Sequence, residues 1–457
     1  MPTEGGLIGL TACPRCDKTP LSQQDNDYFC PACKTEFPLV GGIPWLFADP
    51  EASLGEWRNR LHFELQSLAH ELQRLGDELK SDDLSQLTRK RLLHQKQATD
   101  SHRNSLQQIL APIDIQSMSA SYESYLALRT RLPADQGLHT YYANLHRDWC
   151  WGDDENQASL EQIQAVAGDH DLGDTLVLGS GASRLAYDIH MQMDTARTIA
   201  VDFNPLLLLI AQDVMRGGKP QLYEFPIAPK SIDDFAVLRE LSAPSPVKEN
   251  FHLVLGDVLR PSFAAGQFDT VVTPWLIDII SEEFSVFSQR INALLKPGGR
   301  WINFGSLAFD SPTRARRYSR EEALELLEGN GFAKLNTLEA TIPYMCSPAS
   351  RHGRLETVFT FAATKAKNIK APARYIALPD WIVTGKEPVP LLESFRTQAM
   401  TTQIYMFIMS MIDGKRTIKD MAKLVHEQKL MTRKEAEPAI KNFLTKMYDD
   451  SERQSKF

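Results

Sequence analysis

Five short apolar segments between residues 174 and 305 alternate with helical segments, and this alternation constrains the fold more than any other feature of the chain. They lie in "DTLVLGSGASRLAYDI", "RTIAVDFNPLLLL", "FHLVLGDVL", "FDTVV" and "LLKPGGRWINFG". Strands that alternate with helices form a mostly parallel sheet covered by helices. We therefore predict an α/β fold with a doubly wound sheet, which binds its ligands at the carboxyl ends of the strands.

A glycine turn and two aspartates stand where that edge of the sheet is expected. Gly179 and Gly181 follow the first strand, where the backbone must approach a ligand closely at the start of a helix. Asp202 ends the second strand 23 positions after Gly179, near the spacing of about 20 residues at which an acidic residue meets a ribose diol. Asp257 ends the third strand. The glycine turn alone is a weak motif, because a tight turn also needs glycine for structural reasons.

Four of the six cysteines form two C-x-x-C pairs near the N-terminus: Cys13, Cys16, Cys30 and Cys33. In a chain without a secretion signal, this spacing favours metal thiolates over disulfides, and four converging sulfurs suit a closed structural zinc site. The segment after the second pair, "TEFPLVGGIPWLF", resembles the exit of small zinc ribbons that accompany or activate tRNA and protein methyltransferases. Cys150 and Cys346 are isolated, and we expect them to be buried thiols.

Composition narrows the class of protein. At 457 residues, the chain is long enough for about three domains. Fifty Lys and Arg stand against 58 Asp and Glu, for a net charge of −8, so nucleic acid is a weak candidate partner. The first twenty residues lack an apolar core with a basic flank, and no later stretch is long enough for a membrane span. We expect a cytoplasmic protein with no membrane partner.

Several separate motifs resemble the carnosine N-methyltransferase family of class I S-adenosylmethionine-dependent methyltransferases. The similar segments are "YYANLHRDWCWGDDEN", "VLGSGASRLAYDI" and "TPWLIDIISEEFSVFSQRINALLKPGGRWINFGSLAF", within residues 120 to 365. The resemblance implies a seven-stranded sheet and S-adenosylmethionine as cofactor. In that family's pattern, Arg147 pairs with the methionine carboxylate, while Gly179 and Gly181 line the cofactor. Asp202 holds the ribose and Asp257 reaches the adenine. Ser183 stands where a third glycine is common.

Asp278 matches the family's substrate aspartate, which would accept the N–H of an acceptor imidazole. The resemblance makes Trp275, Asp310 and Tyr344 further substrate-binding candidates, although Asp310 replaces a substrate-contacting histidine of the family. The other interpretation of Asp278 is an N-cap of a helix that begins at Ile279.

The tyrosine-rich segment of the family is replaced by one that carries Arg351, His352 and Arg354. Because guanidinium groups match carboxylates, an acceptor with an anionic group becomes an alternative to carnosine. For His352, a solvated surface position is an equally good interpretation.

We predict four parts: a zinc ribbon (1–50), a helical hairpin (51–118) whose second helix starts at an Asp83 N-cap, a methyltransferase domain (119–365), and a linker with a small helical or winged-helix-like domain (366–457). The last part resembles small peptide-binding winged-helix domains, so it is a possible site for a peptide or protein partner. Two function classes stay open. One is an N-methyltransferase acting on a small histidine-containing molecule or on a larger peptide or protein; the other is a non-catalytic cofactor-binding scaffold.

Overall fold

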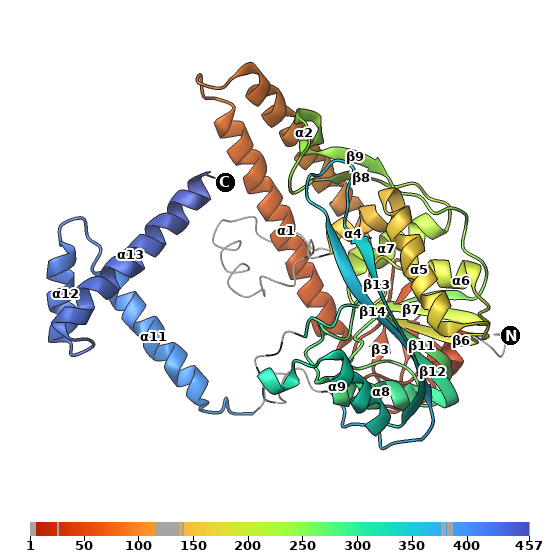
Figure 1. Cartoon of the computed structure of the whole chain (residues 1–457). Coiled ribbons are helices and arrows are strands. Elements are labelled where there is room, and N and C mark those ends of the chain that lie inside the picture. The colour runs from red at the N-terminus through yellow and green to blue at the C-terminus, as the bar shows by residue number, and fades with distance from the viewer. Residues whose placement is uncertain are drawn as a thin grey trace. The chain divides into compact units, whose positions relative to one another are not determined.

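The structure is a computed structural model, which describes residues 6–24, 27–114, 138, 141–309, 311, 313–375, 381 and 387–456. The chain divides into two compact units, residues 1–375 and 376–457. Figure 1 shows the central sheet of the first unit with helices on both of its faces. No helix within the described ranges is long and apolar enough to cross a membrane.

Seven strands between residues 174 and 365 form the main part of the sheet. Their order is β13-β14-β12-β11-β6-β7-β10. Only β14 runs antiparallel to its neighbours within this set, so the predicted α/β class with a mostly parallel sheet is confirmed. The strands are β6 (Asp174–Leu178), β7 (Arg197–Asp202), β10 (Phe251–Gly256), β11 (Phe268–Pro274), β12 (Leu295–Gly305), β13 (Phe332–Tyr344) and β14 (Arg354–Lys365).

Helices cover both faces of this sheet, which explains why its strands are apolar throughout. Along β6, Val177 packs into the core on one face, while Leu176 and Leu178 pack into the core on the other. Strands that are buried on both faces have continuous runs of hydrophobic residues, whereas strands with one exposed face alternate hydrophobic and polar residues. Helices α5 (Asp153–Ala167), α6 (Arg184–Gln192) and α7 (Pro205–Met215) cover the first face, and α8 (Phe284–Leu294) and α9 (Arg320–Gly329) cover the second.

The N-terminal ribbon adds two strands to the sheet, so the sheet has nine strands among the described residues instead of the expected seven. Strand β5 (Ile43–Leu46) pairs in parallel with β10, with Trp45 opposite Leu255 and Leu46 opposite Gly256. The ribbon's other strands are β1 (Ser22–Gln24), β2 (Asp27–Phe29), β3 (Glu36–Phe37) and β4 (Leu39–Val40). The edge of β10 is therefore paired by the ribbon's exit strand instead of being left open.

Helices α1 (Pro50–Glu78) and α2 (Gln86–Ile109) form the expected hairpin. Figure 1 shows the two helices side by side. Leu61, Leu65 and Leu75 of α1 are buried. The N-cap of the second helix is Ser85, whose hydroxyl accepts the Thr88 N–H at 3.1 Å, and not the expected Asp83. Serine is an equally good N-cap, so the local sequence did not distinguish the two.

Shorter elements connect the hairpin to the sheet. Helix α4 (Tyr142–His146) continues into a single π-helical turn, Arg147–Trp151. A separate two-stranded sheet, β8 (Gln221–Glu224) and β9 (Val237–Glu240), follows α7. Strand β8 contacts α2, so the hairpin packs against this insertion as well as against the main core.

The second unit consists of helices α11 (Glu393–Ser410), α12 (Ile418–Glu427) and α13 (Arg433–Lys456), with no strand within residues 387–456. Asp413 lies in the turn before α12, and its carboxylate accepts the N–H groups of Lys415 and Arg416 at 2.9 Å each. A capping box between Thr417 and Asp420 starts α12. The unit is therefore helical, and its described part contains no β-hairpin wing.

Candidate active site and zinc site

The carboxyl ends of six strands meet at one edge of the sheet. Because β13 and β12 both run antiparallel to β14, they point in the same direction, and β12 is parallel to β11. Tyr344 at the end of β13 therefore lies at the same edge as Gly179, Asp202, Asp257 and Trp275. This is the edge at which open α/β sheets bind their ligands.

The glycine turn after β6 is held by the aspartate that ends β7. One carboxylate oxygen of Asp202, Oδ2, accepts the Gly181 N–H at 2.8 Å, and Oδ1 accepts the Asn204 N–H at 2.9 Å. Gly181 has a φ of +57°, and a Cβ built on it would meet no atom within 4 Å. This face of the turn is therefore open, with room for a ligand that approaches the backbone closely. Ser183 adopts a φ of +66°, a conformation that costs a residue other than glycine about 1 kcal/mol.

Asp202 is 5% exposed, and its burial has an electrostatic consequence. Burial raises the pKa of the carboxyl to about 6, although the N–H groups of Asn204, Gly181 and Phe203 act in the opposite direction. The carboxylate is thus ionised at neutral pH but close to its titration range.

The segment "RDW" packs directly against the glycine turn, a long-range contact that no local pattern predicted. The Trp149 Nε1–H donates to the Ala182 carbonyl at 2.9 Å, and Arg184 Nη1 donates to the Asp148 carbonyl at 2.7 Å. Arg184 also pairs with Asp188 at 2.9 Å. These bonds hold Asp148 and Trp149, which follow Arg147 in the sequence, against residues that follow Gly181.

Arg147 lies among carboxylates in this position. Its Nε donates to Asp148 Oδ1 at 2.7 Å and its Nη1 to Glu155 Oε1 at 3.2 Å. Burial acts to lower the pKa of this guanidinium, but the two carboxylates outweigh it and raise the pKa, so Arg147 stays charged. Glu155 also accepts the Met345 N–H at 2.7 Å. No sequence pattern singled out Glu155, since only folding brings it between Arg147 and Met345.

Asp257 lies directly after β10 and is half-buried. Its Oδ1 accepts the Leu259 N–H at 2.9 Å, and its carbonyl accepts the Arg260 N–H at 3.0 Å. Burial raises the pKa of the carboxyl, while the charges of Arg290 and Arg260 act to lower it. The side chain thus shapes the turn at the strand end and keeps one oxygen that makes no described hydrogen bond.

Asp278 lies in an irregular turn between β11 and α8 and is 8% exposed. Its carboxylate accepts the Ser306 hydroxyl, and it accepts the Ala308 N–H at 3.0 Å. The interpretation of Asp278 as a helix N-cap is wrong, because α8 begins at Phe284 and Glu283 caps it. Ser306 and Ala308 follow β12, so Asp278 joins the ends of two neighbouring strands.

Trp275 and Tyr344 form an aromatic pair beside this aspartate. Their ring centroids are 4.8 Å apart, and Trp275 has a φ of +49°, which marks a strained turn directly after β11. Gly305 permits this turn, because a Cβ on it would lie 2.9 Å from the Trp275 Cα. The structure therefore places Trp275 and Tyr344 together, whereas Asp310 lies outside the described residues.

The basic residues of the loop between β13 and β14 already have partners. Arg354 pairs with Glu356 at 2.7 Å and lies over the Tyr344 ring, 4.5 Å from its centroid. Arg351 donates to the Pro229 carbonyl, and both arginines are exposed. His352 is exposed as well, as in the surface interpretation of this residue.

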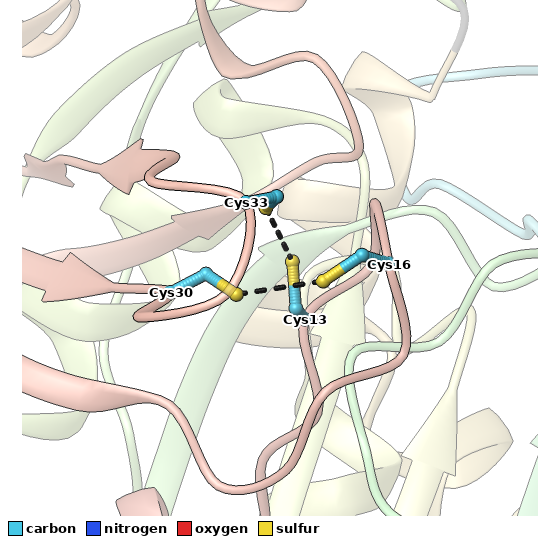
Figure 2. A group of neighbouring side chains, drawn as sticks. All are labelled: Cys13, Cys16, Cys30 and Cys33. Atoms are coloured by element: carbon cyan, nitrogen blue, oxygen red, sulfur yellow. Dashed lines mark hydrogen bonds between the residues drawn. The ribbon is translucent and has the colours of Figure 1, made fainter.

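The four N-terminal cysteines converge, as Figure 2 shows. Their Sγ atoms all lie within 4.8 Å of one another, with Cys13 to Cys33 at 3.6 Å and Cys16 to Cys30 at 3.5 Å. A tetrahedral ion bound at about 2.3 Å would hold its sulfurs about 3.8 Å apart. The cluster therefore has the size and donor set of a zinc site. The two isolated cysteines, Cys150 and Cys346, are exposed. The expectation that their thiols are buried is therefore wrong.

The zinc ribbon contacts the segment that follows Asp257. The Ala12 N–H donates to the Ser262 carbonyl at 2.8 Å, and the Ala264 N–H donates to the Leu10 carbonyl at 2.9 Å. Arg260 Nη2 donates to the Arg15 carbonyl, inside the first C-x-x-C pair, at 2.9 Å. Together with the β5 to β10 pairing, these bonds attach the ribbon to the expected adenine side of the site.

Residues 138–350 match the family model of carnosine N-methyltransferase, which confirms the resemblance seen in the sequence. Similar solved structures include phosphoethanolamine N-methyltransferase 2 of Haemonchus contortus, with 14% identity, 51% of this chain and 58% of that chain covered, and a TM-score of 0.33. The N-methyltransferase NodS of Bradyrhizobium japonicum has 12% identity, with 47% and 97% covered and a TM-score of 0.32. These two scores are too low to bear on function. A comparison with curated protein sequences found no match.

Proposed function

We propose that this protein is an S-adenosylmethionine-dependent N-methyltransferase that methylates an imidazole nitrogen of a small histidine-containing molecule, because its residues 138–350 match the family model of carnosine N-methyltransferase. The observation that carries the proposal is the meeting of Arg147, the glycine turn, Asp202, Asp278 and Trp275 at one edge of the sheet. These residues come from separate parts of the chain, and the fold assembles them where such sheets bind ligands.

The residues at this edge fit S-adenosylmethionine. The open face at Gly181 leaves room for it, the charged Arg147 suits its carboxylate, and Asp202 suits a ribose diol. Asp257 lies beyond Asp202, on the next strand, where the adenine is expected. The cofactor supplies an activated methyl group when it is bound.

Asp278 would orient the methyl acceptor. A carboxylate that accepts one ring N–H of an imidazole selects the tautomer whose other nitrogen carries a free lone pair. Such a nitrogen is already nucleophilic, so the chain mainly needs to align it and exclude water. As the ring gains positive charge, the fixed charge of Asp278 stabilises it, and the Trp275 ring offers a face to the cation. Asp278 can then take up the N–H proton at its carboxylate.

A labelling experiment tests the proposed activity directly. The purified protein is incubated with cell extract and S-adenosylmethionine that carries an isotopically labelled methyl group, and mass spectrometry then identifies each product that gains the label. We expect a labelled methyl-imidazole on a histidine-containing small molecule. Label on a protein instead would favour a macromolecular acceptor. No labelled product in any fraction would favour the scaffold interpretation.

Replacing Asp202 by alanine should raise the Kd for S-adenosylhomocysteine about thirtyfold. The substitution removes a charged hydrogen-bond acceptor worth roughly 2 kcal/mol, and it also frees the Gly181 N–H that the carboxylate now holds at 2.8 Å. Titration calorimetry measures the change. Asp194→Ala, at an exposed aspartate of the same domain, is the matched control and should keep the wild-type Kd. Equal affinities in both variants would mean that Asp202 does not contact the cofactor.

The affinity for S-adenosylhomocysteine should fall as pH decreases through about 6. Burial raises the pKa of Asp202 to about 6 in the free protein, and ribose hydroxyls form stronger hydrogen bonds to the ionised carboxylate than to the protonated carboxyl group. Binding therefore favours the deprotonated carboxyl, so affinity is complete well above pH 6 and is progressively lost below it. Kd values measured from pH 5 to 8 should show this slope in the wild type and lack it in Asp202→Asn.

A further inference from the structure

Helix α11 of the second unit has two apolar faces, and the proposed function uses neither of them. On the inner face, Ile404 and Ile408 belong to the core that α11 forms with α12 and α13. Met406 lies about 200° around the helix from both of them, because each residue of an α-helix adds about 100°. It belongs to an outer face of exposed side chains, which we call the outer stripe. The outer stripe consists of Phe395, Ala399, Thr402, Met406 and Met409.

The outer stripe has the spacing of a seam between two packed helices. Its positions are alternately four and three residues apart, as in a heptad repeat. Phe395 is 40% exposed, Met406 is 64% exposed and Met409 is 50% exposed. A helix with apolar side chains on both sides is usually covered on both sides, and a row of exposed apolar side chains marks an interaction surface. We therefore expect a partner to cover the outer stripe.

The N-terminal half of α11 also lacks support from its own unit. Every residue from Glu393 to Gln403 is exposed, whereas Ile404, Phe407 and Ile408 reach the core. Figure 1 shows α12 and α13 beside the C-terminal end of α11. An isolated helix shorter than about 12 to 15 residues is only marginally stable in water. This half of the helix thus needs a partner that stabilises it.

The outer stripe is complementary to itself when two copies of α11 run antiparallel. A twofold axis between Ala399 and Thr402 then pairs these two residues across the copies, and it pairs Phe395 of each copy with Met406 of the other. Small side chains meet at the centre, so the helices can approach closely. The same arrangement lays the bare N-terminal half of each helix on the half of the other helix that α12 and α13 support. A face that pairs with itself in this way forms an isologous interface.

The charges along α11 favour a second copy of the chain over a charged peptide. Residues 397–412 include no charged side chain. The outer stripe therefore has nothing to attract a charged segment and nothing to repel its own copy. In the antiparallel pair, Arg396 lies opposite Tyr405 of the other copy, which is uncharged. The positive end of each helix dipole also lies beside the negative end of the other.

We propose that the outer stripe binds the outer stripe of a second copy of this chain in an antiparallel pair, so that the protein forms a homodimer through its second unit. This inference is independent of the proposed function. The few side chains of each copy form an interface much smaller than the about 20 to 30 residues per side of a stable complex. We therefore expect a Kd for dimerisation in the micromolar range.

Sedimentation velocity of the full chain tests the homodimer at protein concentrations from about 1 to 200 µM, which bracket a micromolar Kd. We expect a shift from monomer to dimer across this range. Met406→Glu should raise the Kd at least about tenfold, since it places a carboxylate of both copies in the interface. Met400→Glu is the matched control and should keep the wild-type Kd. Met400 is 65% exposed on the same helix, but it lies about 120° around the helix from Met406.

Cross-linking tests the direction of the pair. One copy carries Phe395→Cys and the other carries Met406→Cys, both with Cys150→Ser and Cys346→Ser to remove the exposed isolated thiols. With a short thiol-reactive cross-linker, we expect dimers in the mixture and few in either variant alone. Cross-linked dimers in each variant alone would overturn the antiparallel pairing. A monomer at every concentration, as expected if a peptide of another protein covers the outer stripe, would overturn the homodimer. Equal effects of Met406→Glu and Met400→Glu would overturn the assignment of the outer stripe.

Discussion

Replacement of Asp278 by asparagine is expected to lower turnover about a hundredfold while the Kd for S-adenosylhomocysteine stays nearly unchanged. Loss of a preorganised charge in a comparable site costs about 2.7 to 4 kcal/mol of transition-state stabilisation. Asparagine keeps the shape of aspartate and still offers an oxygen to the Ala308 N–H, which Asp278 accepts at 3.0 Å. The candidate cofactor residues Arg147, Asp202 and Asp257 lie on other elements. Steady-state kinetics with the acceptor identified by labelling measures the effect.

Ser306→Ala distinguishes a structural role of Asp278 from a direct role of its charge in methyl transfer. If Asp278 only holds the loop after β12, removing its Ser306 partner should harm activity and stability about as much as Asp278→Asn does. If its charge acts on the acceptor, Ser306→Ala should stay within about fivefold of wild-type turnover, since it leaves that charge in place. Turnover of Asp278→Asn within about threefold of wild type, a barrier change of some 0.65 kcal/mol, would remove Asp278 from the mechanism.

Loss of the metal site is expected to destabilise the whole first unit and to weaken cofactor binding. Protein prepared without chelator should contain about one zinc ion, and Cys13→Ser with Cys16→Ser should abolish it. Structural zinc in isolated fingers contributes about 10 kcal/mol or more. In this larger unit, we expect a loss of about 4 kcal/mol, which lowers Tm by roughly 5 °C. Elemental analysis and thermal unfolding measure both quantities.

The ribbon should also transmit this loss to the cofactor site. Arg260 reaches the Arg15 carbonyl at 2.9 Å, and β5 pairs with β10 up to Gly256, directly before Asp257. When the ribbon loosens, Asp257 loses support, and we expect about a tenfold higher Kd for S-adenosylhomocysteine. Cys150→Ser is the matched control, because Cys150 is exposed and far from the cluster in sequence. Wild-type Tm and affinity in the zinc-free variant would show that the ribbon is an independent module.

The sequence by itself determined the features that depend on neighbouring residues. Apolar runs such as "TLVL" predicted strands, and Gly179 and Gly181 predicted a tight turn, in which both residues adopt a positive φ. Two C-x-x-C pairs predicted the cluster that the fold assembles. Each of these signals arises within a few residues, because backbone conformation and side-chain periodicity are local properties. The predicted N-cap of the second hairpin helix, Asp83, is wrong and the N-cap is Ser85. Both residue types suit an N-cap, so the local sequence could not distinguish them.

Only the tertiary structure determined which residues from distant parts of the chain lie side by side. The pairing of Trp45 with Leu255 turns the ribbon into part of the sheet, although more than two hundred residues separate them. The contact of Trp149 with Ala182 attaches the segment that contains Arg147 to the end of the glycine turn, and Glu155 reaches Met345 from a different element. A cavity beside His146 likewise needs the hairpin, α4 and the loop after β13 together. Such contacts depend on packing between distant segments and on burial, which raises the pKa of Asp202 and lowers that of His146, so no local pattern could predict them.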